Sequence, residues 1–203
     1  MEINTIRLRK LLGWLGLFLP WIVVILLHKF PDSISSTYYT YQAGPVFMII
    51  LGSAGFLLIS YKGYDLFDDI LNTIAGVFAL SICVFPCYNS SLQYVGTFQL
   101  SPDISYIIHN SSAIVFFACL SFNSLFRFTK TSGNMTKKKK CRNIIYRICG
   151  IGMLGAFALF LLPSFHIKVW LIEAIALLFF GVSWLTKANC YPFLFADSYK
   201  KEG

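Results

Sequence analysis

Residues 11–28 read LLGWLGLFLPWIVVILLH, an apolar run that contains no acidic residue, lysine or arginine. Five further apolar stretches follow it, at residues 43–61, 70–88, 107–126, 144–163 and 169–186. Each stretch is close to the ~20 residues that cross ~30 Å of hydrocarbon as a helix. The pattern predicts an all-α polytopic membrane protein, with residues 1–203 forming a single domain that is a bundle of six transmembrane helices.

The composition agrees with lipid as the solvent of this chain. Hydrophobic residues make up 57% of it and charged residues 13%, whereas a soluble domain carries about 25% charged residues. The apolar run at residues 11–28 is longer than the core of a signal peptide, and no cleavage site follows it, so we interpret it as a retained span. Six spans and their short loops leave no stretch for a soluble catalytic domain.

The basic residues predict the orientation of the helices. Of the 17 lysines and arginines, fifteen lie in the N-terminal segment, the loop after the second stretch, the loop after the fourth and the C-terminal tail. The loops on the opposite side hold Lys29 and Lys168 alone. Because positive charge collects on the cytoplasmic side, both termini are predicted to be cytoplasmic in a multi-pass protein of the cell membrane. Charge distributed in this way argues against nucleic-acid binding.

A polar cluster is predicted on the cytoplasmic side. Its residues come from the loop before the third span and from the start of the fifth: Lys62, Asp65, Asp68, Asp69, Asn72, Arg142 and Arg147. Arg147 stands about one turn inside its span, where a guanidinium has to pair or reach the lipid surface. We therefore expect Arg147 to pair with an aspartate. The alternatives are contact of Arg147 with lipid phosphate, and aspartates placed to favour a helix N-terminus.

A second group of polar residues is predicted at the outer side. Glu173 is the one acidic residue deep within an apolar run, and an ionisable group there is a candidate functional residue. Residues at similar depth complete a predicted outer pocket: His109, Asn110, Ser112, Tyr38 and Tyr39. The alternatives are a buried hydrogen bond of Glu173 that tightens helix packing, and hydrolytic chemistry that uses His109 and Ser112.

No cofactor or metal site is expected, because the cysteines and histidines do not occur at ligand spacings. The basic run Lys137–Arg142 could bind anionic lipid head groups or an acidic protein partner. The alternative is that this run only determines topology. The oligomeric state and any protein partner stay open.

Several motifs occur in an order that resembles a family of small, mostly bacterial, six-helix integral membrane proteins. They are SISSTYYT (33–40), YKGYD (61–65), IAGVFAL (74–80), FP (85–86), HxxSA (109–113), RNxxYR (142–147), Glu173 and FGVSWLTK (180–187). The resemblance covers about residues 30 to 187. It implies a six-helix membrane fold and no established activity.

The sequence thus favours a membrane protein that binds or moves a small solute, ion or lipid through a polar pocket between helices. One alternative is an intramembrane lipid hydrolase or head-group transferase, so an enzyme is left uncertain but less favoured. The other is an accessory subunit of a membrane complex.

Overall fold

A computed structural model describes residues 2–131, 135–160 and 168–190. The described residues form six α-helices and two short helical segments, which confirms the all-α prediction. The α-helices are α1 (Glu2–Leu27), α2 (Gly44–Ile59), α3 (Leu66–Val84), α4 (Pro102–Phe122), α5 (Lys137–Phe160) and α6 (Val169–Lys187). A 3-10 helix, η1 (Ser35–Tyr39), precedes α2, and a π-helix, η2 (Asn123–Arg127), follows α4.

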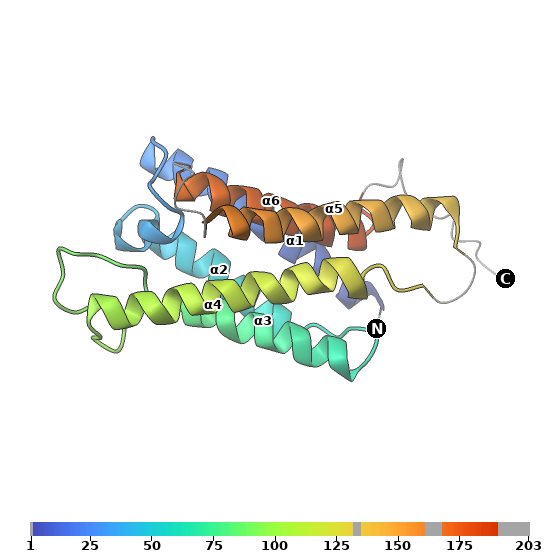
Figure 1. Ribbon diagram of the computed structural model, residues 1–203, viewed down its shortest axis with the longest axis horizontal. Coiled ribbons are helices and arrows are strands. Elements are labelled where there is room, and N and C mark those ends of the chain that lie inside the picture. The colour runs from blue at the N-terminus through green and yellow to red at the C-terminus, as the bar shows by residue number, and fades with distance from the viewer. Residues whose placement is uncertain (1, 132–134, 161–167, 191–203) are drawn as a thin grey trace.

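The six helices form two layers of three (Figure 1). In one layer α6 packs against α1 and α5, and in the other α3 packs against α2 and α4. Smaller contacts between α1 and α2 and between α4 and α5 join the layers. We call the end of the bundle that contains Glu173 the Glu173 end, and the end that contains Arg127 the Arg127 end.

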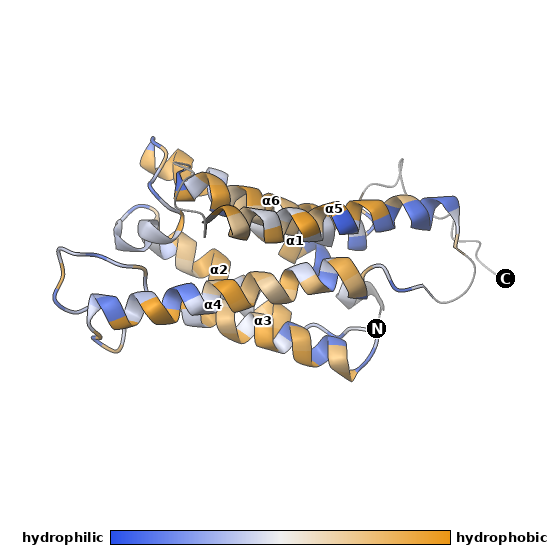
Figure 2. Cartoon of the chain, viewed as in Figure 1, coloured by the Kyte–Doolittle hydropathy of each residue, from blue (hydrophilic) through white to orange (hydrophobic). Residues whose placement is uncertain are grey.

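Among the described residues, four helices are long and apolar enough to cross a membrane: Thr5–Leu27 of α1, α3, α4 extended to Arg127, and α6. The apolar α2, with 16 residues, is shorter. Figure 2 shows hydrophobic residues concentrated along the middle of the bundle, with hydrophilic residues towards its ends. Large apolar side chains such as Ile25, Phe56 and Ile151 are exposed on the outer faces, which suits a bundle surrounded by acyl chains.

The helices begin earlier than the apolar stretches suggest. α1 starts at Glu2 rather than at residue 11, and α3 starts at Leu66 rather than at residue 70. The Asp65 side chain accepts a hydrogen bond from the Asp68 backbone N–H and so caps α3. Hydropathy detects the apolar centre of a helix, whereas capping groups decide where the helix begins.

Glycines let helices approach closely within each layer. A Cβ on Gly76 of α3 would lie 2.5 Å from the backbone oxygen of Gly55 in α2. In the other layer, a Cβ on Gly181 of α6 would lie 2.8 Å from the Gly13 oxygen of α1. Small residues of this kind drive helix association in lipid, because they bring the two backbones into van der Waals contact.

We expect Gly76→Ala to lower the free energy of unfolding by about 1–3 kcal/mol, because the new methyl group meets backbone that has to shift. Gly52→Ala is the matched control, since a Cβ there meets no atom within 4 Å. The control should be neutral or slightly stabilising, because alanine is the better helix former. Unfolding in mixed detergent micelles measures both, and equal losses would show that close α2–α3 packing is not the cause.

Candidate functional site

A cavity of about 320 Å³ lies between the two layers near the Glu173 end. All six helices contribute to its wall, and α4 and α6 contribute most. Apolar side chains, including Phe116, Phe117 and Leu177, line its deeper part. Polar residues line the part nearest the helix ends, and they include Asp32, Ser33, Ser35, Ser36, His109, Asn110 and Glu173. The cavity is therefore amphipathic, with an apolar interior and polar groups at one end.

Glu173 anchors the segment that follows α1. Its carboxylate accepts hydrogen bonds from the backbone N–H of Ile34 and, at 3.0 Å, from the Ser35 hydroxyl. These donors lie at the start of η1, so Glu173 caps a short helix from another part of the chain. The Trp170 backbone N–H also donates to the Asp32 backbone carbonyl oxygen at 2.9 Å. The start of α6 thus holds the segment along the edge of the cavity.

His109 links α4 to the end of α3. Its Nδ1 lies 2.8 Å from the carbonyl oxygen of Phe85, which can only accept, so this nitrogen carries the proton. The nearby Ser105 hydroxyl donates to the Pro86 oxygen at 2.7 Å. His109 is 4% exposed, and its ring forms part of the cavity wall beside Asn110.

Three residues of the predicted outer pocket lie away from the cavity. The hydroxyls of Ser112 and Ser81 are 2.8 Å apart between α4 and α3. The Tyr39 hydroxyl donates to the Cys87 oxygen at 2.6 Å, and burial raises the pKa of Tyr39 above its usual value. Tyr38 packs edge-on against Tyr39. The prediction therefore has to be corrected: Glu173, His109 and Asn110 line the cavity, whereas Ser112, Tyr38 and Tyr39 do not.

Hydrolytic chemistry would require direct contacts between a nucleophile, a base and a third group. Within the described residues, no hydrogen bond joins His109, Ser112 and Glu173 to one another. Each of these side chains is instead bonded to a neighbouring helix or loop. Among the described residues, these three side chains therefore do not form a catalytic triad.

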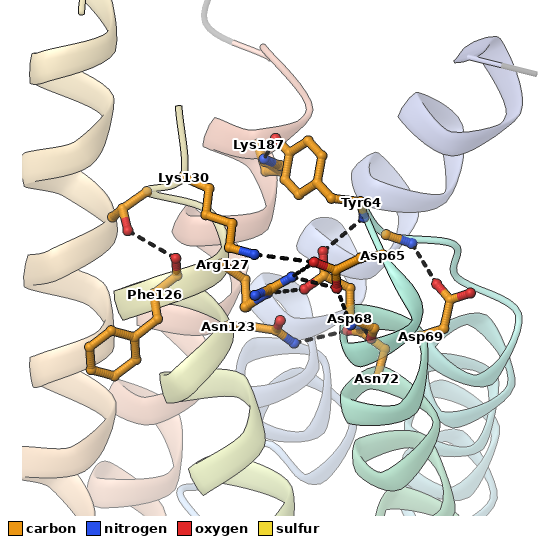
Figure 3. Close-up of polar contacts among 12 residues, drawn as sticks. Tyr64, Asp65, Asp68, Asp69, Asn72, Asn123, Phe126, Arg127, Lys130 and Lys187 are labelled. Atoms are coloured by element: carbon orange, nitrogen blue, oxygen red, sulfur yellow. Dashed lines mark hydrogen bonds and ion pairs between the residues drawn. The ribbon is translucent and has the colours of Figure 1, made fainter. Parts of the chain in front are cut away.

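The predicted aspartates meet an arginine at the opposite end of the bundle (Figure 3). The Arg127 Nη2 donates to both Asp65 carboxylate oxygens at 2.6 Å, and its Nε donates to the Asp68 carboxylate. Asp68 is 3% exposed and Arg127 is 8% exposed, so this pair is buried. Lys130 adds a contact of 3.2 Å to Asp65. We call Asp65, Asp68, Arg127 and Lys130 the Arg127 network.

Two asparagines continue the Arg127 network towards the membrane-spanning part of the bundle. Asn72 donates to the Asp68 backbone oxygen at 2.7 Å, and Asn123 donates to the Asn72 side-chain oxygen at 2.9 Å. One residue further along the chain, the hydroxyls of Ser124 and Ser183 lie 2.7 Å apart and link η2 to α6. Buried polar groups connected in this way hold the helices in one register.

The remaining members of the predicted cytoplasmic cluster have other roles. Asp69 accepts from the Gly63 backbone N–H at 2.8 Å and pairs with Lys62 at 3.1 Å. Arg142 donates to the Asn189 side chain at 3.2 Å. The expected pair between Arg147 and an aspartate is wrong. Among the described residues Arg147 forms no ion pair, its side chain is exposed, and Arg127 takes the expected place.

Helical periodicity could not identify Arg127, because it lies in the π-helix η2. The Phe128 backbone N–H donates to the backbone carbonyl oxygen of Asn123, five residues earlier, at 2.9 Å. A π-turn holds one residue more than an α-turn, so it rotates the following side chains by about 100° around the axis. The one available signal was the position of Arg127 at the end of an apolar stretch, on the same side as the acidic loop.

The Arg127 network should make stability depend on pH in the acid range. Hydrogen bonds from Arg127 and from the Asp68 N–H lower the pKa of Asp65 from 3.8 to about 2. A carboxyl with a lowered pKa stabilises the fold above its unfolded-state value, and this contribution is lost as the pH falls towards 2. We expect unfolding curves recorded between pH 5 and about pH 2 to show this loss, and Asp65→Asn to reduce it.

Comparisons with protein-family models, curated proteins and solved structures found no match to this chain.

Proposed function

We propose that this chain is an integral membrane protein of the cell membrane that binds a lipid or a lipid-like amphiphile in the cavity near the Glu173 end. The supporting observation is the division of the cavity into an apolar interior and a polar end. Its volume of about 320 Å³ lies within the range of small-molecule sites. Phe116, Phe117 and Leu177 would contact an acyl chain, and Glu173 and Asn110 would accept hydrogen bonds from a head group.

The distribution of polar groups supports an amphiphile over an ion or a polar solute. A desolvated ion needs several polar ligands around it, and burying polar groups without partners is costly. Here the polar groups occupy one end of the cavity and aromatic and aliphatic side chains occupy the rest. A carboxylate oxygen can accept more than one hydrogen bond, so Glu173 can bind a head-group donor while it holds Ile34 and Ser35.

The proposal includes six membrane crossings with both ends in the cytoplasm. Four helices satisfy the length and hydropathy required of a span. α2 packs along α3, and α5 packs along α6, so each lies beside one of the four. The 16 residues of α2 extend about 24 Å, and local thinning of the bilayer accommodates a span of that length. The basic run Lys137–Arg142 then lies near the cytoplasmic surface, where it favours anionic lipids.

Cysteine labelling tests this topology. The loop between α3 and α4 is expected outside the cell, and the start of α5 inside. In intact cells, a membrane-impermeant maleimide should label Ser91→Cys but not the natural Cys141, in chains that keep one cysteine each. Both positions are exposed in the structure, so burial does not protect either thiol. Labelling of Cys141 from outside would contradict the proposed orientation.

Native mass spectrometry tests the binding function itself. The chain, released from membranes in mild detergent, should carry one amphiphile per copy that exchanges for an added amphiphile in a saturable manner. A chain without bound amphiphile, and with no saturable uptake when lipids are added back, would contradict the proposal.

A further inference from the structure

Three motifs of the sequence meet at the Arg127 end of the bundle, away from the cavity. Tyr61 of YKGYD packs edge-on against Trp184 of FGVSWLTK, with ring centroids 5.1 Å apart. Phe128 contacts both Trp184 and Tyr146 of RNxxYR, with centroids 5.2 and 5.5 Å away. These four rings form an aromatic floor, and they come from the loop after α2, the segment after η2, α5 and α6.

Three cationic side chains contact this aromatic floor. Lys187 is 8% exposed, and its Nζ lies 4.4 Å from the ring centroid of Tyr64 and 5.2 Å from that of Phe128. The Lys139 Nζ donates to the Phe128 backbone oxygen at 2.9 Å. The Arg9 Nε donates to the Tyr61 hydroxyl at 3.1 Å. The three cations come from three different helices, α6, α5 and α1.

Among the described residues, these three cationic side chains donate hydrogen bonds to uncharged oxygens. The Lys187 Nζ donates to the Tyr64 hydroxyl (Figure 3), and Lys139 and Arg9 also bond to uncharged oxygens. Within the described residues, no carboxylate lies within ion-pair distance of Arg9, Lys139 or Lys187. Lys187 is repelled by Arg9, Lys139 and Arg142, and Asp68, which attracts it, is already paired with Arg127.

A buried ammonium group without a counter-ion is costly, and nearby positive charges add to that cost. An anion placed between these side chains would remove both costs. A phosphate group suits the arrangement better than a carboxylate, because it offers three or four oxygens to donors that come from three different helices. Tyr64 is 60% exposed, so an anion can reach the Lys187 ammonium by displacing the tyrosine hydroxyl.

We propose that Arg9, Lys139 and Lys187 bind a phosphate group at the Arg127 end of the bundle, supplied by an anionic phospholipid head group or by free phosphate. The site is separate from the cavity and does not depend on the amphiphile proposed there. On the proposed topology it lies at the cytoplasmic membrane surface, at the depth of lipid phosphates.

Thermal unfolding of the full chain in lipid nanodiscs tests this site, with two arms that distinguish the sources. One arm compares nanodiscs of phosphatidylcholine alone with nanodiscs that also contain phosphatidic acid. The other arm adds inorganic phosphate to phosphatidylcholine nanodiscs, against chloride at equal ionic strength. The variant is Lys187→Gln, and the matched control is Lys10→Gln, which removes an exposed charge from α1 at the same end of the bundle.

The unfolding temperature of the wild type should rise on addition of phosphatidic acid, of inorganic phosphate, or of both. The addition that raises it identifies the source of the bound phosphate group. Lys187→Gln should lose this shift, and in phosphatidylcholine alone it should unfold at or above the wild-type temperature, because an unneutralised buried charge has gone. A purely structural lysine would not produce this reversal. Native mass spectrometry should show Lys187→Gln binding phosphatidic acid about tenfold more weakly, and Lys10→Gln within about twofold of wild type.

Two results would overturn the proposal: no shift of wild type in either arm, or equal shifts in wild type and Lys187→Gln. If Lys187→Gln does not fold, Arg9→Gln and Lys139→Gln replace it, since both side chains lie at the edge of the site and are partly exposed. A negative result for the phosphate site leaves the cavity proposal intact. The cavity proposal is tested separately by Ala113→Phe, which alters the cavity and not the phosphate site.

Discussion

Replacing Arg127 with alanine should lower the free energy of unfolding by about 3–5 kcal/mol, the usual cost of breaking a buried ion pair on one side. Asp68 is 3% exposed, and without Arg127 its carboxylate would have no charged partner. Asp65 would also lose its two contacts of 2.6 Å with the guanidinium. Unfolding of the purified chain in mixed detergent micelles measures this loss.

Two further variants make the Arg127 experiment specific. Arg147→Ala should change the free energy of unfolding by less than about 0.5 kcal/mol, because its side chain is exposed and forms no ion pair among the described residues. The double variant Asp68→Leu with Arg127→Leu should be more stable than either single variant, because it leaves no buried charge unpaired. Equal losses in Arg127→Ala and Arg147→Ala would contradict the described network.

The second large effect is expected from filling the cavity. Ala113 lines the cavity on α4, so Ala113→Phe should place a ring where the amphiphile binds. Losing the burial of that part of the ligand costs about 2–3 kcal/mol, which makes binding about 30- to 150-fold weaker. The measurement is saturable uptake of an added amphiphile, followed by native mass spectrometry.

Ala118→Phe is the matched control for this experiment. Ala118 lies on the same helix, receives the same substitution and points outwards, because it is exposed and does not line the cavity. Its affinity for the amphiphile should stay within about twofold of wild type. If both variants bind as wild type does, the amphiphile occupies some other surface.

Much of the fold could be predicted because helices in lipid need long apolar stretches, and each of the six predicted stretches contains much of one observed helix. The beginnings of α1 and α3 were missed because they depend on polar groups such as the Asp65 cap. Glu173 and His109 were placed at one end by their depth in their stretches, and the structure brings both to one cavity.

Other parts of the site depend on tertiary contacts that local sequence does not report. The donors to Glu173 come from Ile34 and Ser35, more than a hundred positions earlier in the chain. Arg127, which pairs with Asp68, lies at the end of the π-helix η2, and this π-helix breaks the helical period. The pairing of Lys187 with Tyr64 likewise joins two distant motifs, and neither motif alone indicates the other.

The most direct test of an amphiphile-binding cavity is photo-crosslinking with a fatty-acyl probe that carries a diazirine within its chain. The account predicts adducts on the cavity residues Phe116, Phe117 and Leu177, and an excess of unlabelled amphiphile should remove them. Adducts confined to outward-facing residues such as Ile25 and Ile151, unaffected by unlabelled amphiphile, would contradict it.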